Sequence, residues 1–298
     1  MGCRNAPKRI LAFAMSDQSQ SRDPKFHAQE TRTLPEPGVP AIPFVNWVGL
    51  RTLYIKEVRR FFKVQLQTVW APALTTLLFL VIFTVALGRG DREILGVPFN
   101  AFLAPGLIVM GMIQNAFANS SFSLLVGKIQ GTIVDYLMPP LSTLEMLIAL
   151  VGGAVTRALC VGVTVWAAMW LWGIDVSPEH FWAIAFFGLM GSIMLALAGV
   201  LTSMWAEKFD HAAAVTNFVV QPLALLSGTF YTIERLDPIF QTISAFNPFF
   251  YVISGFRYGF IGASDSSLVT GVVALTLINI SLCALCYTLL VKGWKVKS

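Results

Sequence analysis

Residues 128–142 read Lys-Ile-Gln-Gly-Thr-Ile-Val-Asp-Tyr-Leu-Met-Pro-Pro-Leu-Ser and lie between two long apolar runs. Four of the apolar side chains recur at helical spacing on one face: Ile129, Ile133, Tyr136 and Leu137. The pattern predicts a short amphipathic helix. Pro139 and Pro140 end it, because the residue before a proline is pushed out of the helical region. Such a helix between two membrane spans is either a connector at the membrane surface or a docking element for a soluble partner, and its residues leave both interpretations open.

The composition indicates an integral membrane protein. Of the 298 residues, 56% are hydrophobic and 12% are charged, and the mean hydropathy is +0.69, whereas a soluble domain has about 25% charged residues. The net charge of +5 agrees with an excess of lysine and arginine in cytoplasmic loops, and we find no cluster typical of nucleic-acid binding. Cys283 and Cys286 have CxxC spacing, but inside an apolar run they are most simply small apolar residues rather than a metal or redox site.

Six apolar runs have the length that crosses a membrane, which is about 20 residues. They lie at 69–87, 102–126, 144–172, 181–205, 213–231 and 268–291. The further stretch 238–261 is interrupted by Asn247-Pro248, so we expect a re-entrant or interfacial hairpin that does not cross, with Arg257 near the outer headgroups. The predicted fold is therefore all-α, an integral membrane protein with six transmembrane helices.

The chain before the first run divides into two parts. Residues 1–44 are polar and rich in proline, which predicts a disordered tail, and residues 45–298 form the membrane domain. Residues 44–65 are amphipathic with a basic polar face, which is typical of an interfacial helix on the cytoplasmic side. The excess of basic residues on that side predicts that both termini are cytoplasmic. The same rule predicts cytoplasmic loops at 128–142 and 206–212, and outer segments at 88–101, 173–180 and 232–267.

Polar side chains inside the runs are the candidates for function. Arg157 lies within the third run, where a charge costs about 2.5–3.5 kcal/mol on insertion scales and usually faces the bundle interior. It is either a substrate or gating contact, or a structural bond to a neighbouring span. Amide side chains form stripes on the second and fifth runs, where they either hold helices together or line a pathway. They are Gln114, Asn115, Asn119, Asn217 and Gln221.

The sequence shows no catalytic constellation. The three histidines lie in the tail and in two loops that are predicted on opposite sides of the membrane, so they cannot form one metal site. Gly127-Lys128 is similar to the end of a phosphate-binding loop, but Phe122 and Ile129 stand where the loop needs glycine and serine or threonine. We therefore expect a chain that is not an enzyme and that binds no cofactor itself.

Three segments resemble motifs of the permease subunit of ABC-2 type exporters. They are Phe102-Leu-Ala-Pro-Gly-Leu-Ile-Val-Met110, Leu226-Ser-Gly-Thr-Phe-Tyr231 and Asn247-Pro-Phe-Phe-Tyr-Val-Ile-Ser-Gly-Phe-Arg257. In the third segment Pro248, Tyr251 and Arg257 have the spacing of the outer signature of that family. The likeness covers about residues 45–297. It is strongest to the bacterial branch of one-domain permeases, which includes the nodulation-factor exporter permease and its enterobacterial relatives.

The resemblance implies a homodimer in the bacterial inner membrane, surrounded by lipids and joined to two copies of a separate ABC ATP-binding subunit. It makes residues 128–142 the coupling helix, and it makes residues 45–298 an ABC-2, or type V, permease domain. The implied contact residues are Lys128, Gly131, Asp135 and Tyr136, and ATP and Mg²⁺ belong to the partner. The implied substrates are amphiphiles, such as lipids, glycolipids, polysaccharides or drugs. The alternative is an ion-coupled secondary transporter, which usually has acidic residues near the midplane; no acidic residue lies deep in any run.

Overall fold

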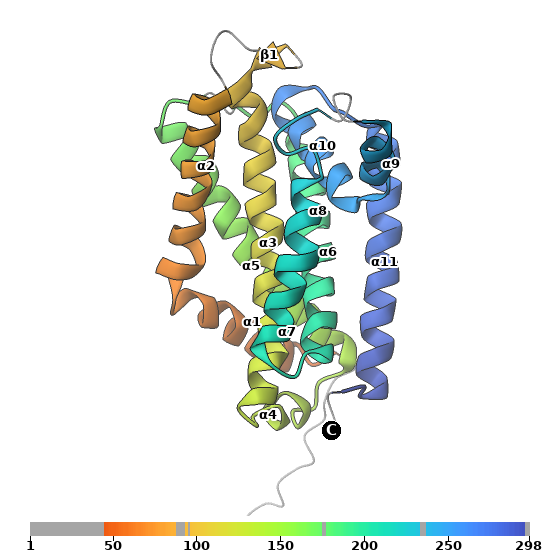
Figure 1. Ribbon diagram of the computed structural model, residues 1–298. Helices are drawn as coiled ribbons and strands as arrows, with labels where there is room; N and C mark the ends of the chain where they lie inside the picture. The colour runs from red at the N-terminus through yellow and green to blue at the C-terminus, as the bar shows by residue number, and fades with distance from the viewer. Residues whose placement is uncertain (1–44, 88–92, 95, 175–176, 233–236, 296–298) are drawn as a thin grey trace, which may run out of the picture. The chain divides into compact units, whose positions relative to one another are not determined.

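Long helices that run side by side make up most of the structure (Figure 1). The computed structural model describes residues 45–87, 93–94, 96–174, 177–232 and 237–295, all within one unit of the chain. Five helices are long and apolar enough to cross a membrane: α2 Ala71–Leu87, α3 Phe99–Ile129, α5 Thr143–Leu171, α6 Phe181–Trp205 and α11 Leu268–Lys292. A π-helix, η2 Leu66–Trp70, precedes α2 and extends the same span.

The predicted all-α fold is confirmed for the described residues, apart from one small hairpin. Its two strands, β1 Glu93–Ile94 and β2 Val97–Pro98, pair antiparallel. The five long helices match five of the six predicted runs to within a few residues. The tail predicted at residues 1–44, and residues 88–92 of the first predicted outer loop, lie outside the described residues.

Helix α3 lies at the centre of the bundle. It packs against α2, α5, α6 and α10 (Pro248–Ile261), and it is the most buried of the five long helices. Helix α6 approaches it closely at Gly199, where an added Cβ would lie 2.7 Å from the backbone oxygen of Phe117. A glycine at such a crossing lets two helix backbones come together. Helices α2 and α11 are the least buried of the five and expose mainly apolar side chains.

Helix α1 Trp47–Phe62 packs along α5 before the first span begins. The Asn46 side chain caps α1 by accepting a hydrogen bond from the Gly49 amide at 2.9 Å. The buried face consists of Leu53, Glu57 and Phe61. The exposed face is basic and carries Arg51, Lys56 and Arg59. The helix that the amphipathic pattern predicted is therefore present, and its place at the membrane interface stays a prediction.

The fifth predicted run forms a composite helix. It consists of α7 Phe209–Val215, the π-helix η3 Thr216–Val220 and α8 Gln221–Leu225, which follow one another directly. It ends at Leu225 rather than at Tyr231, because the Ser227 hydroxyl bonds the Ala224 carbonyl and Gly228 adopts a φ of 75°. The composite helix is not among those that are long enough to span by length and composition, so the sixth crossing stays a prediction.

The interrupted stretch after it forms two short helices, α9 Pro238–Phe246 and α10. They meet at Asn247, whose amide nitrogen donates to the Leu223 carbonyl (2.7 Å) and whose oxygen accepts from the Phe249 amide (3.1 Å). Pro248 takes the first helical position of α10, where a missing N–H costs nothing. The predicted break is confirmed, and the hairpin lies at the same end of the bundle as β1 (Figure 1). Its re-entry into the membrane stays a prediction.

Candidate functional site

The segment between α3 and α5 lies at the end of the bundle opposite β1 (Figure 1). Helix α3 ends at Ile129, Gly131 adopts a φ of 72°, and a single helical turn, α4 Val134–Leu137, follows. The prediction of one amphipathic helix from Lys128 is therefore wrong, because a glycine in the left-handed region ends a helix. Beyond the two prolines, Ser142 and Glu145 form a capping box that starts α5.

The Lys128 side chain binds other residues of the same chain. Its Nζ donates to three backbone oxygens at the end of α6, those of Ser203 (3.2 Å), Met204 (2.8 Å) and Ala206 (2.6 Å). The last carbonyls of a helix have no partner inside it, and cations bind them favourably. Lys128 thus joins the ends of α3 and α6.

Tyr136 is also turned inward. It is buried, with the Lys56 ammonium 3.5 Å from its ring centroid, and its hydroxyl donates to Glu57 Oε1 at 3.4 Å. Both partners belong to α1, so Tyr136 fixes α4 against that helix. A second contact lies nearby, where the backbone N–H of Asn46 donates to Glu145 Oε1 at 2.6 Å. Helices α1, α4 and α5 therefore meet as one unit.

The remaining residues of this segment form an exposed surface, which we name the α4 surface. It consists of Gln130, Gly131, Thr132, Val134, Asp135, Leu137 and Met138. Met138 is 78% exposed, and a Cβ added at Gly131 would meet nothing within 4 Å. A cavity of about 210 Å³ lies beside it between α1 and α4, with Lys56, Asp135 and Tyr136 in its wall. Of the four predicted coupling residues, Gly131 and Asp135 are thus the ones open to a partner.

Inside the bundle, two arginines from different elements reach the same face of α3. Arg157 Nη2, on α5, donates to Asn115 Oδ1 at 2.8 Å. Arg60 Nη2, on α1, donates to the backbone oxygen of Asn119 (2.8 Å) and to its Oδ1 (3.3 Å). The fully buried Glu57 carries Oε2 at 2.8 Å from Arg60 Nη2. We name these five residues the arginine cluster; three of them, Asn115, Asn119 and Arg157, were predicted.

The other two members of the arginine cluster, Glu57 and Arg60, were not singled out from the sequence. A signal was present, because Glu57 is the one acidic residue of α1 and lies midway between Leu53 and Phe61 on its apolar face. Arg60 follows three residues later, which is a spacing at which opposite charges pair on a helix. An acid on the apolar face of a basic helix therefore marks an internal ion pair.

The other predicted amide side chains, Gln114, Asn217 and Gln221, do not all lie together. Gln114 Nε2 donates to Gln221 Oε1 at 3.1 Å, which joins α3 to α8. Asn217 takes no part in this contact and lies on an exposed face of η3. A cavity of about 330 Å³ between α2 and α3 has a partly polar wall, which includes Gln67, Thr75, Thr76, Gln114 and Asn115. The two polar stripes thus touch at one point, beside a cavity.

The three motif segments meet at Arg257. Its Nη1 donates to Asp265 Oδ2 (2.6 Å), its Nη2 donates to the Gly228 oxygen (2.8 Å), and its guanidinium carbon lies 3.9 Å from the Phe102 ring centroid. Arg257 is 1% exposed, so protein groups enclose it, and its depth relative to the headgroups stays a prediction. Tyr251 donates from its hydroxyl to the Ala245 oxygen at 2.9 Å, across the α9–α10 corner.

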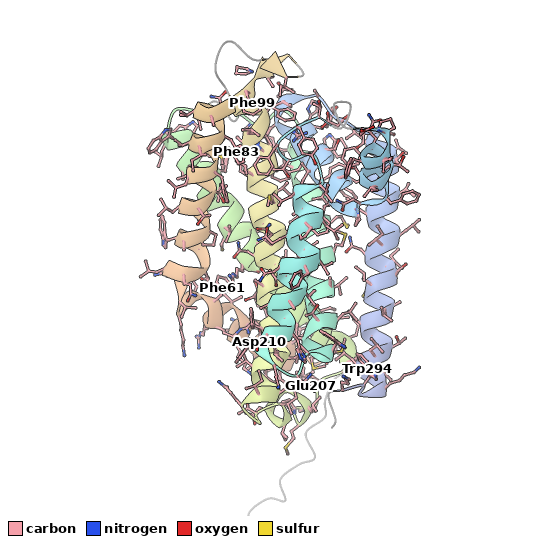
Figure 2. The ribbon with its side chains drawn as sticks, viewed as in Figure 1. Phe61, Phe83, Phe99, Glu207, Asp210 and Trp294 are labelled. Carbon is pink, nitrogen blue, oxygen red and sulfur yellow. The ribbon has the colours of Figure 1, made fainter. Side chains whose placement is uncertain are left out.

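Figure 2 shows that Glu207, Asp210 and Trp294 lie at one end of the bundle and Phe99 at the other. Lys295 Nζ donates to Glu207 Oε1 at 3.1 Å, and this hydrogen bond and charge lower the pKa of the exposed Glu207 carboxyl. The α6–α7 connection and the end of α11 thus lie together. They share the end that carries α4 (Figure 1), and the side of the membrane that this end faces stays a prediction.

Known proteins are similar to this chain in sequence. Residues 49–261 match the protein family described as ABC-2 type transporter. The chain is 34% identical over 252 residues to the inner membrane transport permease YadH of Escherichia coli strain K12, with 85% of this chain and 98% of YadH covered. YadH of Shigella flexneri matches with the same identity and coverage. The chain belongs to the ABC-2 type transporter family.

Membership of the ABC-2 family confirms the resemblance and fixes the broad role of the chain. An ABC-2 permease is a transport subunit, and the family implies association with an ABC ATP-binding subunit. The five apolar helices and the inner-membrane relative together describe a multi-pass inner-membrane protein. The alternative of an ion-coupled secondary transporter is a different class, and the family match argues against it.

Proposed function

We propose that this ABC-2 permease is the membrane subunit of an ATP-driven exporter that moves an amphiphile outward across the bacterial inner membrane. Two copies form a homodimer, and each copy binds one ABC ATP-binding subunit. ATP and Mg²⁺ are held by that subunit, and the permease chain binds no cofactor. The observation that carries the proposal is the exposed α4 surface, which lies at the end of the bundle predicted to be cytoplasmic.

The α4 surface has the chemistry of a small protein interface. Val134, Leu137 and Met138 are 39–78% exposed and lie in the chain between the candidate spans α3 and α5, so in this proposal a partner covers them rather than lipid tails. Interfaces combine an apolar centre with a few well-placed polar anchors. Asp135 is the acidic anchor of this surface, so the matching pocket on the ATP-binding subunit should be basic.

Lys128 and Tyr136 have a different role in this proposal from the contact role that the sequence suggested. They bind α6 and α1 from the inner side of the segment. A displacement of α4 by the partner is therefore passed to both helices and to α3. Gly131 and Asp135 receive the partner, and Lys128 and Tyr136 transmit its movement.

The proposed pathway runs beside α3 and the composite helix. An exposed polar side chain at the level of a span faces protein or a water-lined route rather than lipid. Asn217 meets that description on η3, and Gln114, Gln221 and the partly polar cavity lie on the neighbouring helices. We propose that this side of the chain faces the second copy, with the substrate moving between the two.

The topology completes the proposal. The composite helix of α7, η3 and α8 is the fifth of six crossings, and α9–α10 enters the membrane from the outer side and returns. Both termini are then cytoplasmic, on the side of the α4 surface. Glu207, whose carboxylate accepts from Lys295, lies at the end of the bundle that carries α4 (Figures 1 and 2), which supports this arrangement.

The test is purification of the permease with an ABC ATP-binding subunit encoded beside it. Size-exclusion chromatography with light scattering should give a complex of two permeases and two ATP-binding subunits, and the complex should hydrolyse ATP. A permease that remains monomeric and captures no ATP-binding subunit would contradict the proposal.

A further inference from the structure

The arginine cluster carries more positive charge than its own residues balance. Arg60 and Arg157 contribute two positive charges, and Glu57 contributes one negative charge. Among the residues that the structure describes, Arg157 forms no ion pair, and its guanidinium donates to the neutral side-chain oxygen of Asn115. A net positive charge between helices is unfavourable in a medium of low dielectric unless an anion joins it.

Hydrogen bonding in the cluster is incomplete on the donor side. Arg60 Nε, Arg157 Nε and Asn119 Nδ2 are buried and have no acceptor within the described part of the chain. Buried N–H donors are normally paired, so three unpaired donors in one cluster call for a further acceptor. Glu57 Oε2 does not supply it, because it faces Arg60 as an ion pair without a well-formed hydrogen bond.

Helix packing accounts for only part of this arrangement. Arg60 holds α1 against α3, and its charge is balanced by Glu57. Arg157 is not needed for that contact, since it comes from α5 and binds the other asparagine, one turn away. An apolar residue at position 157 would pack α5 against α3 without a charge. The unbalanced arginine is therefore the feature that points to a ligand.

The cluster also borders an open space. Asn115, which accepts from Arg157, is in the wall of the partly polar cavity between α2 and α3. Gln67, Thr75 and Gln114 of the same wall can bond hydroxyl or phosphate oxygens. A polar head group of a ligand in that cavity would thus lie next to the Asn115 side chain, which binds the Arg157 guanidinium.

We propose that the arginine cluster is a binding site for an anionic head, a phosphate ester or a chemically similar group, on the amphiphile that this permease transports. Arg157 supplies the positive charge, and Asn115 orients the Arg157 guanidinium. Arg60 and Asn119 supply the remaining hydrogen-bond donors. Guanidinium groups suit phosphate because their N–H groups form paired bonds to its oxygens. The proposal rests on the proposed function, and it narrows the substrate from amphiphiles in general to anionic ones.

The first experiment measures binding to the permease alone, in nanodiscs of phosphatidylcholine. Dodecyl phosphate is the probe, and dodecyl maltoside is the uncharged probe of equal chain length. Asn115→Asp places a carboxylate beside Arg157, so the charge is balanced internally; this variant should fold and should bind dodecyl phosphate about tenfold or more weakly. Arg157→Gln should lose binding to a similar extent, and Arg157→Lys should retain part of it.

Arg59→Gln is the matched control, because it removes the same charge from an exposed position of α1. It should change the affinity for dodecyl phosphate by less than about twofold. Dodecyl maltoside should not distinguish wild type from Asn115→Asp. Equal affinities of wild type and Asn115→Asp for dodecyl phosphate, or wild-type binding of both probes to the same extent, would overturn the site.

A second experiment separates a transported head from a bilayer phospholipid. In the complex with the ATP-binding subunit, dodecyl phosphate should raise ATP hydrolysis, and Arg157→Gln should remove that rise. Phosphatidylglycerol in the nanodisc could displace dodecyl phosphate while ATP hydrolysis does not respond to dodecyl phosphate. In that case the cluster binds membrane lipid, and the proposal that it binds a transported anion is refuted. Failure to form the complex would refute the proposed function instead, while the binding titration on the permease alone still decides the site.

Discussion

Lys128 Nζ lies 2.6 Å from the backbone oxygen of Ala206, the residue that follows the last turn of α6. Two further carbonyls of that turn accept from the same ammonium. The contact therefore joins two spans through one charged side chain. Hydrogen bonds to a charged group contribute about 1.5–3 kcal/mol each when buried, and the partial exposure of Lys128 reduces that figure.

We accordingly expect Lys128→Met to destabilise the permease by about 1–3 kcal/mol, because methionine keeps the apolar stem and removes the three donors. The measurement is the thermal unfolding midpoint of the purified protein in detergent. Lys292→Met is the control, since Lys292 is an exposed lysine at the end of α11. Equal midpoints for the two variants would show that the α3–α6 contact contributes nothing.

Arg257 and Asp265 form a buried ion pair that joins the three motif segments. Removing one partner of such a pair costs about 3–5 kcal/mol, because the other charge is left buried. We expect Arg257→Leu to lower the unfolding midpoint strongly, and we expect Arg257→Leu with Asp265→Leu to recover part of the loss. A double variant that is as unstable as the sum of the two single variants would show that the pair is not coupled.

Two glycines of the spans should respond differently to substitution by alanine. At Gly199 the added Cβ meets the Phe117 backbone oxygen at 2.7 Å, whereas at Gly111 the nearest atom, Thr76 Oγ1, is 3.7 Å away. Gly199→Ala should destabilise the protein by about 1–3 kcal/mol through overpacking. Gly111→Ala should be neutral or stabilising by up to about 1 kcal/mol, since alanine favours a helix interior. Unfolding midpoints that shift alike in both variants would contradict the packing of α3 on α6.

Thiol labelling tests the position of the α9–α10 hairpin. In a variant without the native cysteines, Thr242→Cys and Ser267→Cys should both react with a membrane-impermeant reagent added from outside, because both positions are exposed. Ser244→Cys should stay unreactive, since Ser244 is fully buried and its hydroxyl donates to the Leu226 oxygen. Labelling of Thr242→Cys or Ser267→Cys from the cytoplasmic side only would place the hairpin on the wrong side of the membrane.

The spans could be predicted because the length of an apolar run is evident from one continuous stretch of sequence. The α6 prediction, 181–205, agrees with Phe181–Trp205 at both ends. Local backbone geometry was harder to predict from the sequence. Gly131 lies inside an amphipathic pattern and nevertheless ends α3, because a pattern of side chains does not report a positive φ. For the same reason the composite helix was predicted to continue past Leu225.

The candidate site was only partly predictable, because its contacts join distant elements. Arg157 and Asn115 were recognised as polar residues in apolar runs, but nothing in the sequence paired them. Lys128 was predicted to contact the ATP-binding subunit, and its partners in the structure are backbone oxygens at the end of α6. Polarity within a span identifies a residue of interest, and packing decides which neighbour it binds.

In the proposed function, the α4 surface receives the ATP-binding subunit. Asp135→Lys reverses the charge of its acidic anchor and should place like charges across the contact, which lowers affinity. Gln130→Lys is the control, because it adds a lysine to the same exposed surface and leaves Asp135 in place. Both variants should remain folded and dimeric in size-exclusion chromatography.

The deciding measurement is capture of the ATP-binding subunit by each purified permease, quantified beside the ATP hydrolysis of the captured complex. We predict that Asp135→Lys weakens capture by about tenfold or more, and that Gln130→Lys stays within about threefold of wild type. Capture and hydrolysis by Asp135→Lys equal to those of wild type would contradict docking of the ATP-binding subunit on the α4 surface, and residues 128–142 would then be a connector at the membrane surface.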